Sequence, residues 1–143
     1  MSEFEGKTVL ITGCARARGM GRAIAVAFAR AGADVVATDV ASGGTRNENE
    51  EGLEEIRLGW KGLESLATEI EGLGRRILTL VGDVSRAPDV DRMVADALRR
   101  FGRLDVLVNN AAAPMAPTAG SSGRCRRRPG TLSWASISRA STS

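Results

Sequence analysis

The segment that decides the fold is TVLITGCARARGMGRAIAVAFARAG, residues 8–32. It begins with a short β-branched apolar run, Thr8–Thr12, which is typical of a strand buried on both faces. A glycine-rich turn follows, and Gly21–Ala31 then predicts a helix that Gly32 closes as the C′ glycine. The apolar stripe expected on this helix consists of Ile24, Phe28 and Ala31, with Ala25 beside them.

The alternation of strand and helix continues along the chain. Further strands are predicted at residues 34–39, 77–81 and 105–108, and helices at residues 60–73 and from Pro88, at position N1, to Phe101. Between the second strand and the second helix, residues 41–59 are polar and Gly-rich, with an acidic run from Glu48 to Glu55 that indicates a surface loop. Strands that alternate with helices through short links predict an α/β fold with a parallel sheet of about four strands and right-handed crossovers.

The composition excludes several classes of protein. A chain of 143 residues with 43% hydrophobic and 26% charged residues fits one globular domain, and no apolar run approaches the roughly 18 residues of a membrane span. There is no His and no Tyr, so the commonest general base and metal ligand are absent, and we expect no metal site. With only Cys14 and Cys125, a disulfide framework is excluded, and a cytoplasmic location is expected.

The charge divides the chain into two parts. All 17 acidic side chains precede residue 119, whereas residues 119–143 are rich in serine and carry only basic charge. The arginines of this second part are Arg124, Arg126, Arg127, Arg128 and Arg139. Because the second part also lacks apolar periodicity, it cannot bury enough surface to offset its ordering entropy. We therefore expect a partial domain at residues 1–118 and an unstructured tail at residues 119–143.

The chemistry is concentrated where the strands end, because ligands of an open parallel sheet bind outside the carboxyl ends of its strands. The glycines between Thr12 and Gly21 allow the backbone to approach a pyrophosphate, whose charge then meets N–H groups at the start of the helix. Asp39 follows Gly21 by 18 residues, the spacing at which a carboxylate accepts hydrogen bonds from the ribose hydroxyls of an adenosine. These features predict a dinucleotide site.

Four segments resemble the short-chain dehydrogenase/reductase family in their order and spacing: TGCARARGMG, the strand-terminal Asp39, Gly82-Asp83-Val84 and Asn109-Asn110-Ala111-Ala112. The resemblance covers roughly residues 5–118 and implies a Rossmann-like doubly wound sheet, of which this chain holds the first half. The usual glycine motif of the family is TGxxxGxG. Here five residues separate Gly13 from Gly19, which resembles a longer-loop variant.

The resemblance also implies a set of cofactor contacts. Asp83 and Val84 would flank the adenine, and Asn110 and Ala111 would pass beneath the adenine-side ribose. The full set expected to bind the cofactor is Gly13, Arg18, Gly19, Met20, Gly21, Asp39, Asp83, Val84, Asn110, Ala111 and Ala112.

The choice of cofactor depends on two opposed features. The Asp39 carboxylate would repel a 2′-phosphate, whereas Arg16 and Arg18 in the glycine-rich turn could attract it. Because Asp39 is expected to face the ribose hydroxyls themselves, NAD is favoured over NADP.

The family's catalytic motif is missing from this sequence. Its proton donor is a Tyr in a YxxxK motif, but the chain has no Tyr, and its only lysines are Lys7 and Lys61. No catalytic position can be carried over, so we expect the cofactor-binding portion of an oxidoreductase without turnover of its own.

Two other functions stay open: a non-catalytic dinucleotide-binding module, and, less favoured, a nucleic-acid binder acting through the cluster Arg124–Arg128. The resemblance also implies that this chain lacks the helices through which subunits of the family pair, so the usual homo-oligomer is not expected. The last predicted strand would lie at a sheet edge and would promote aggregation.

The genetic code, applied to Gly123–Ser143, leads to a hypothesis for why the YxxxK motif is missing. The segment can be back-translated with synonymous codons chosen so that the reading frame shifted by two bases gives KMPEATWDLVLGVNLKGVYL. This string resembles the family's next helix, WDxVLxVNLKG, including its catalytic Asn. The hypothesis is that the reading frame is lost between about Ala113 and Gly123. Sequencing of the coding DNA is expected to show a shifted frame that continues into YxxxK, and a shifted frame without that motif contradicts the hypothesis.

Overall fold

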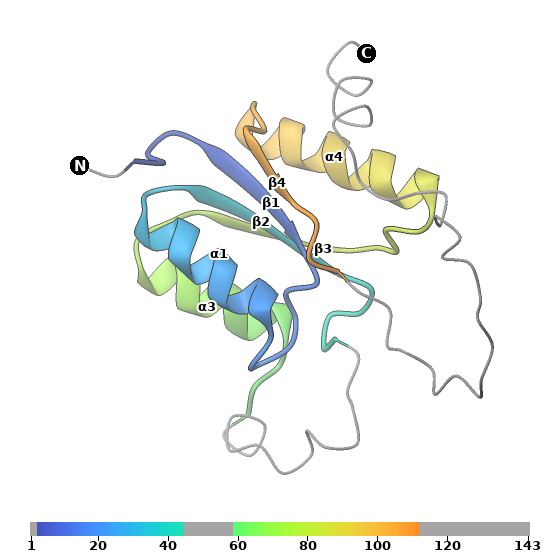
Figure 1. The fold of residues 1–143 in the computed structure, drawn as a ribbon, viewed down its shortest axis with the longest axis horizontal. Helices are drawn as coiled ribbons and strands as arrows, with labels where there is room; N and C mark the ends of the chain where they lie inside the picture. The colour runs from blue at the N-terminus through green and yellow to red at the C-terminus, as the bar shows by residue number, and fades with distance from the viewer. Residues whose placement is uncertain (1–2, 45–58, 112–143) are drawn as a thin grey trace, which may run out of the picture.

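A computed structural model describes residues 3–44 and 59–111 of the chain (Figure 1). Its centre is a four-stranded sheet in the order β3-β2-β1-β4, in which every pair of neighbouring strands is parallel. The strands are β1 (Thr8–Thr12), β2 (Asp34–Asp39), β3 (Ile77–Val81) and β4 (Val106–Val108). The prediction of an α/β fold with a four-stranded parallel sheet is thus confirmed.

Helices cover both faces of the sheet. Helices α1 and α3 lie on one face and α4 lies on the other (Figure 1). The bounds of the helices are Met20–Arg30 for α1, Leu63–Gly72 for α3 and Ala87–Phe101 for α4. This layering makes the sheet doubly wound, as a chain that alternates strands and helices requires.

The core consists of two apolar layers that alternate along the strands. Val9 and Ile11 of β1 face α1 and α3, whereas Leu10 between them faces α4, where it packs in one cluster with Met93. All five residues of β1 are buried because this strand has a neighbour on each side and helices on both faces. The strand that leads into the glycine-rich turn is therefore enclosed on all sides.

The buried stripe of α1 differs from the predicted one. Gly21, Ala25 and Ala29 are the buried residues, while Ile24 and Phe28 are only partly buried and pack at the sides of the contact. Small residues on the stripe allow the helix backbone to lie close to the sheet, and larger side chains then have room only at its flanks. The predicted C′ glycine is confirmed, since Gly32 has φ +98° and the N–H of Ala33 donates to the Phe28 carbonyl at 3.0 Å.

Several predicted boundaries are wrong by one to three residues. Helix α1 is Met20–Arg30 and not 21–31, and α3 ends at Gly72 and not Leu73. Helix α4 begins at Ala87, which makes Pro88 the second helical residue.

Two further differences are explained by packing or hydrogen bonding. The helix expected from residue 60 begins at Leu63, because Gly62 has φ +77° and packs against the backbone of Ser42 so closely that a Cβ atom would overlap it. The strand expected from Asp105 begins at Val106. Asp105 instead caps the start of β1, since its Oδ2 accepts the N–H of Thr8 at 2.9 Å.

Three expectations concern parts of the chain outside the described residues. These are the acidic surface loop at Glu48–Glu55, the domain boundary at residue 118 and the tail at residues 119–143 with its arginine cluster. Among residues 3–44 and 59–111, the structure contains no helix that is long and apolar enough to span a membrane.

We predict that the Asp105 carboxylate stabilises the fold in a pH-dependent way. Hydrogen bonds from the Arg103 guanidinium, at 2.6 and 2.7 Å, lower the pKa of Asp105, although its partial burial acts in the opposite direction. A lowered pKa in the folded state means that the contribution is present above the unfolded-state pKa and disappears as the pH falls through the folded-state value. Asp105→Asn should therefore lower the free energy of unfolding by about 1 kcal/mol or less at pH 7.

Urea denaturation followed by circular dichroism at pH 7 and at about pH 3 measures this effect. The matched control is Asp96→Asn, which removes a half-buried carboxylate that pairs with Arg99 at 3.3 Å on the same helix. The prediction is contradicted if the free energies of unfolding of wild type and Asp105→Asn differ by the same amount at both pH values.

Candidate cofactor-binding site

The glycine-rich turn begins at Gly13, where only glycine fits. Its φ of +74° is a left-handed conformation, and a Cβ atom there would lie 2.9 Å from the Cα of Ala111. The N–H groups of Gly13 and Cys14 both donate to the Thr38 carbonyl, at 2.8 and 3.1 Å. The turn is thus held against β2 on one side and against the segment after β4 on the other.

The start of α1 lies directly on this turn. A Cβ atom on Gly21 would overlap the carbonyl oxygen of Gly13, so the helix can approach the end of β1 only with glycine here. Gly19 is the N-cap residue, and its N–H donates to the Arg16 carbonyl at 3.1 Å. No side chain caps α1, and Met20, its first residue, is 70% exposed. Backbone N–H groups at such a helix start favour an anion.

Asp39 contacts the turn as well as standing at the end of β2. Its Oδ2 accepts the N–H of Ala15 at 2.9 Å, and its Oδ1 accepts the N–H of Val40 at 2.7 Å. Each carboxylate oxygen has a second lone pair, so both can still accept a hydroxyl proton. The sequence predicted a ribose contact for Asp39 but not this bond, which orients the carboxylate and the turn together.

Asn110 links the ends of β1 and β4. Its side-chain amide donates to the carbonyls of Thr12 and Gly13, both at 3.1 Å. The Thr12 hydroxyl in turn accepts the N–H groups of Asn110 and Ala111, at 3.1 and 2.9 Å. The prediction singled out Asn110 and Ala111 but not the Thr12 side chain, whose position directly before Gly13 was the available signal.

The turn after β3 completes the edge. The N–H of Gly82 donates to the Asp39 carbonyl at 3.0 Å, which ties the ends of β2 and β3 together. Asp83 Oδ1 accepts both the N–H and the hydroxyl of Ser85, at 2.8 and 2.6 Å, and Val84 packs partly buried against the α4 layer. These two residues therefore lie at the carboxyl edge of the sheet, as expected.

Most of the predicted residues are thus brought to one edge of the sheet. Gly13, Asp39, Asn110 and Ala111 are connected through direct hydrogen bonds or close packing with their neighbours. Arg18 is exposed on the glycine-rich turn. Ala112 lies outside the described residues, so the structure does not test it.

Cys14 is the one thiol among the described residues, and its environment makes it a poor nucleophile. It is fully buried, and its Sγ–H donates to the Ile11 carbonyl at 3.3 Å. Burial raises the pKa of Cys14 to about 12, so the reactive thiolate is not formed at neutral pH. Within residues 3–44 and 59–111, no three His, Cys, Asp or Glu side chains are grouped so as to hold a metal ion.

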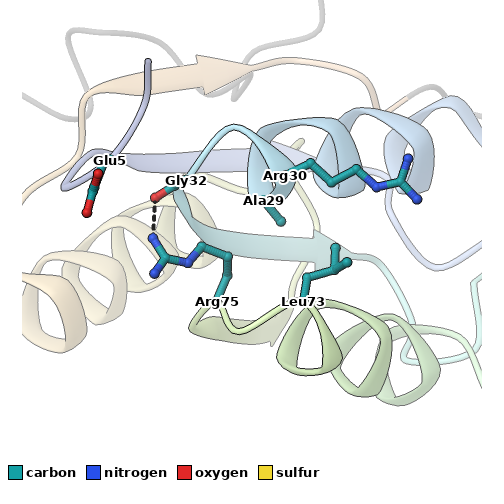
Figure 2. Close-up of a pocket in the computed structure, with 6 residues that line it drawn as sticks. All are labelled: Glu5, Ala29, Arg30, Gly32, Leu73 and Arg75. Carbon is teal, nitrogen blue, oxygen red and sulfur yellow. Dashed lines mark hydrogen bonds between the residues drawn. The ribbon is translucent and has the colours of Figure 1, made fainter. Parts of the chain in front are cut away.

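A hollow of about 420 Å³ lies at the opposite end of the strands (Figure 2). It is lined by Glu5, Ala29, Arg30, Gly32, Leu73 and Arg75. The Arg75 guanidinium donates to the Gly32 carbonyl at 2.7 Å and so satisfies a carbonyl just beyond the end of α1. Because the hollow is open and its arginines are accompanied by Glu5, we assign it a structural role and not a part in the site.

Comparison with known proteins agrees with this geometry. The family described as short chain dehydrogenase matches residues 7–123. The chain belongs to this family. Members of the family are oxidoreductases with a Rossmann-type fold that bind NAD(P), which confirms the resemblance drawn from the glycine turn and the three later motifs.

Individual relatives are similar over most of this chain. It is 37% identical over 111 residues to an L-rhamnose 1-dehydrogenase (NAD(P)(+)) of Sphingomonas sp., covering 78% of this chain and 36% of the relative. It is 36% identical over 108 residues to a 3-oxoacyl-[acyl-carrier-protein] reductase of Thermotoga maritima, covering 76% and 36%. A carveol dehydrogenase of Mycobacterium avium, solved in complex with NAD, superposes with a TM-score of 0.63 at 31% identity, over 89% of this chain and 42% of that one. The chain spans little more than a third of the length of the curated relatives.

We predict that the contact between Gly21 and Gly13 does not tolerate a methyl group. Gly21→Ala should lower the free energy of unfolding by about 2–3 kcal/mol, because the added Cβ forces the start of α1 away from β1. The matched control is Gly72→Ala at the last residue of α3, where nothing lies within 4 Å of an added Cβ. That control should stabilise the chain by about 0.5–1 kcal/mol through helix propensity. Urea denaturation of both variants measures the two free energies of unfolding. Equal changes of this free energy in Gly21→Ala and Gly72→Ala would refute the prediction.

Proposed function

We propose that this chain is the dinucleotide-binding portion of a short-chain oxidoreductase, and that its cofactor is NAD in preference to NADP. The proposal covers residues 1–118 as the partial cofactor domain. The observation that carries it is the set of hydrogen bonds along the carboxyl edge of the sheet. In this set Gly82 and Ala15 bond to Asp39, Gly13 bonds to Thr38, and Asn110 bonds to Gly13. It prearranges the edge before any ligand arrives, so that binding costs less ordering entropy.

The residues of this edge fit the parts of a dinucleotide. Gly13, Gly19 and Gly21 leave the backbone bare where α1 begins, and the N–H groups of the first turn, near Arg18 and Met20, would hold the pyrophosphate. Bound there, NAD would supply the hydride acceptor or donor of the reaction.

The adenosine half would lie further along the edge. Asp39 would accept hydrogen bonds from the ribose hydroxyls, since its carboxylate is already oriented by the N–H groups of Ala15 and Val40. Asp83 and Val84 would flank the adenine, and Asn110, Ala111 and Ala112 would line the ribose from below. A 2′-phosphate would have to lie next to the Asp39 carboxylate, which is the reason for preferring NAD.

Turnover is not part of the proposal for these 143 residues. By ancestry the reaction is hydride transfer between NAD and an alcohol or carbonyl compound, as the names of the relatives indicate for those proteins. The sequence contains no Tyr and therefore no YxxxK motif, so the family's proton donor is not supplied by it. A binding module without catalysis remains the second candidate, and the same absence favours it. Because Cys14 is a buried free thiol, we keep the cytoplasm as the proposed location.

Calorimetric titration of the purified chain with NAD and with NADP tests the proposal. NAD should bind about tenfold or more tightly than NADP, because the 2′-phosphate adds negative charge beside Asp39. Asp39→Asn should narrow that ratio while circular dichroism shows a folded chain. The matched control is Asp91→Asn, which removes an exposed carboxylate from α4 and should leave the ratio unchanged. A folded chain that binds neither cofactor contradicts the proposed function, and equal affinity for both contradicts the role of Asp39.

A further inference from the structure

Two side chains from outside the glycine-rich turn bond to it and a third supports one of them, and none of the three was singled out by the sequence as a site residue. Arg22 belongs to α1, Trp60 precedes α3, and Glu69 lies in α3. We call them the Arg22–Trp60–Glu69 cluster. Because they come from segments almost 50 positions apart, only the fold brings them together.

The cluster holds two carbonyl groups of the turn. The indole N–H of Trp60 donates to the Ala15 carbonyl at 2.9 Å, and the Arg22 guanidinium donates to the Ala17 carbonyl. The Arg22 guanidinium also stacks on the indole of Trp60, 4.1 Å from the ring centroid, and its Nε donates to Glu69 Oε2 at 3.0 Å. Arg22 thus connects α3 and the indole to the turn.

The position of Arg22 is costly for a cation. It stands in the first turn of α1, where the helix dipole repels positive charge, and that turn contains no acidic residue. Glu69, the indole face and the Ala17 carbonyl offset this cost, and the Arg22 and Glu69 side chains are only 26% and 33% exposed. Three favourable contacts hold a cation where the helix dipole disfavours one. This indicates that the geometry of the turn depends on Arg22.

The hydrogen bonds of the cluster fix peptide planes. In a trans peptide the C=O and the following N–H point in opposite directions, so binding the Ala15 carbonyl to Trp60 turns the N–H of Arg16 away from Trp60. The bond from Arg22 to the Ala17 carbonyl orients the N–H of Arg18 in the same manner. Ala15 is therefore held at both ends, by Asp39 at its N–H and by Trp60 at its carbonyl.

We propose that Trp60 and Arg22, supported by Glu69, are positioning residues that set the backbone of the five residues between Gly13 and Gly19 for the phosphates of a dinucleotide. A longer turn has more conformations to lose on binding, and the cluster removes them in advance. This inference rests on the proposed function, because it assigns the turn a phosphate ligand. None of the three residues touches the ligand in this proposal.

The test compares two variants with matched controls in the full chain. Trp60→Phe keeps an aromatic ring but removes the indole N–H, and Arg22→Lys keeps the charge but removes the planar fork. The control for the first is Trp134→Phe, the same change at the other Trp of the sequence. The control for the second is Arg30→Lys, at an exposed position at the far end of α1. Calorimetry measures the Kd for NAD, ligand-observed NMR measures the Kd for adenosine, and circular dichroism measures the Tm.

Each of the two variants should weaken NAD binding about fivefold, the loss expected for one hydrogen bond. Adenosine contains the base and ribose but no phosphate, so its affinity should not change, and neither control should change either affinity. In the Trp134→Phe background, NAD but not adenosine should also alter the fluorescence of Trp60.

Three results would overturn the inference, and they can be told apart. Wild type and both variants binding NAD equally would remove the role of the cluster and leave the proposed function standing. Parallel losses of NAD and adenosine affinity with a lowered Tm would make the cluster a structural support only. A folded wild-type chain that does not bind NAD would overturn the proposed function and this inference with it.

Discussion

The structure depends on the contact between the end of β1 and the start of α1, where Gly13 and Gly21 meet without a side chain between them. A single Cβ at Gly21 would overlap the Gly13 carbonyl oxygen, so this approach defines where the helix begins. Once the helix lies there, its small residues Ala25 and Ala29 follow against the sheet, and larger side chains are moved to the flanks. The same contact places the start of α1 at the carboxyl edge of the sheet, where the other strands also end.

That edge is held together mainly by backbone groups and short side chains. Thr12, Asp39 and Asn110 each bond to the chain segment that follows a neighbouring strand, so the loops are tied to one another and not only to their own strands. Such an arrangement is suited to recognising phosphates and ribose, because hydrogen-bond donors and acceptors are in place before binding. The opposite end of the strands carries ion pairs such as Arg76 with Asp34 and Arg103 with Asp105, which stabilise the fold and have no part in the candidate site.

Prediction succeeded where the physical cause is local. The limits of β1, β2 and β3 follow from short apolar runs between glycines or polar residues, and the end of α1 follows from Gly32 with its positive φ. It failed where a distant segment decides the outcome. The start of α3 is moved to Leu63 by the packing of Gly62 on Ser42. Asp105 lies just before β4, where its backbone N–H and its carboxylate both bond to Thr8 of β1.

The sequence by itself determined the order of strands and helices, the family and the residues at the strand ends, because periodicity and glycine spacing act within a few positions along the chain. Only the tertiary structure decided that Asp39 bonds to the glycine-rich turn at Ala15 and that Thr12 bonds to the segment after β4. The same is true of the hydrogen bonds that Trp60 and Arg22 donate to carbonyl groups of the turn. The bonds of Asp39, Thr12 and Trp60 join segments that are 24, 99 and 45 positions apart in sequence. Arg22 is only five positions from Ala17, but Trp60 and Glu69 from a distant segment hold its side chain in place. These contacts depend on how the sheet and its helices bring the segments together, and no spacing along the chain encodes them.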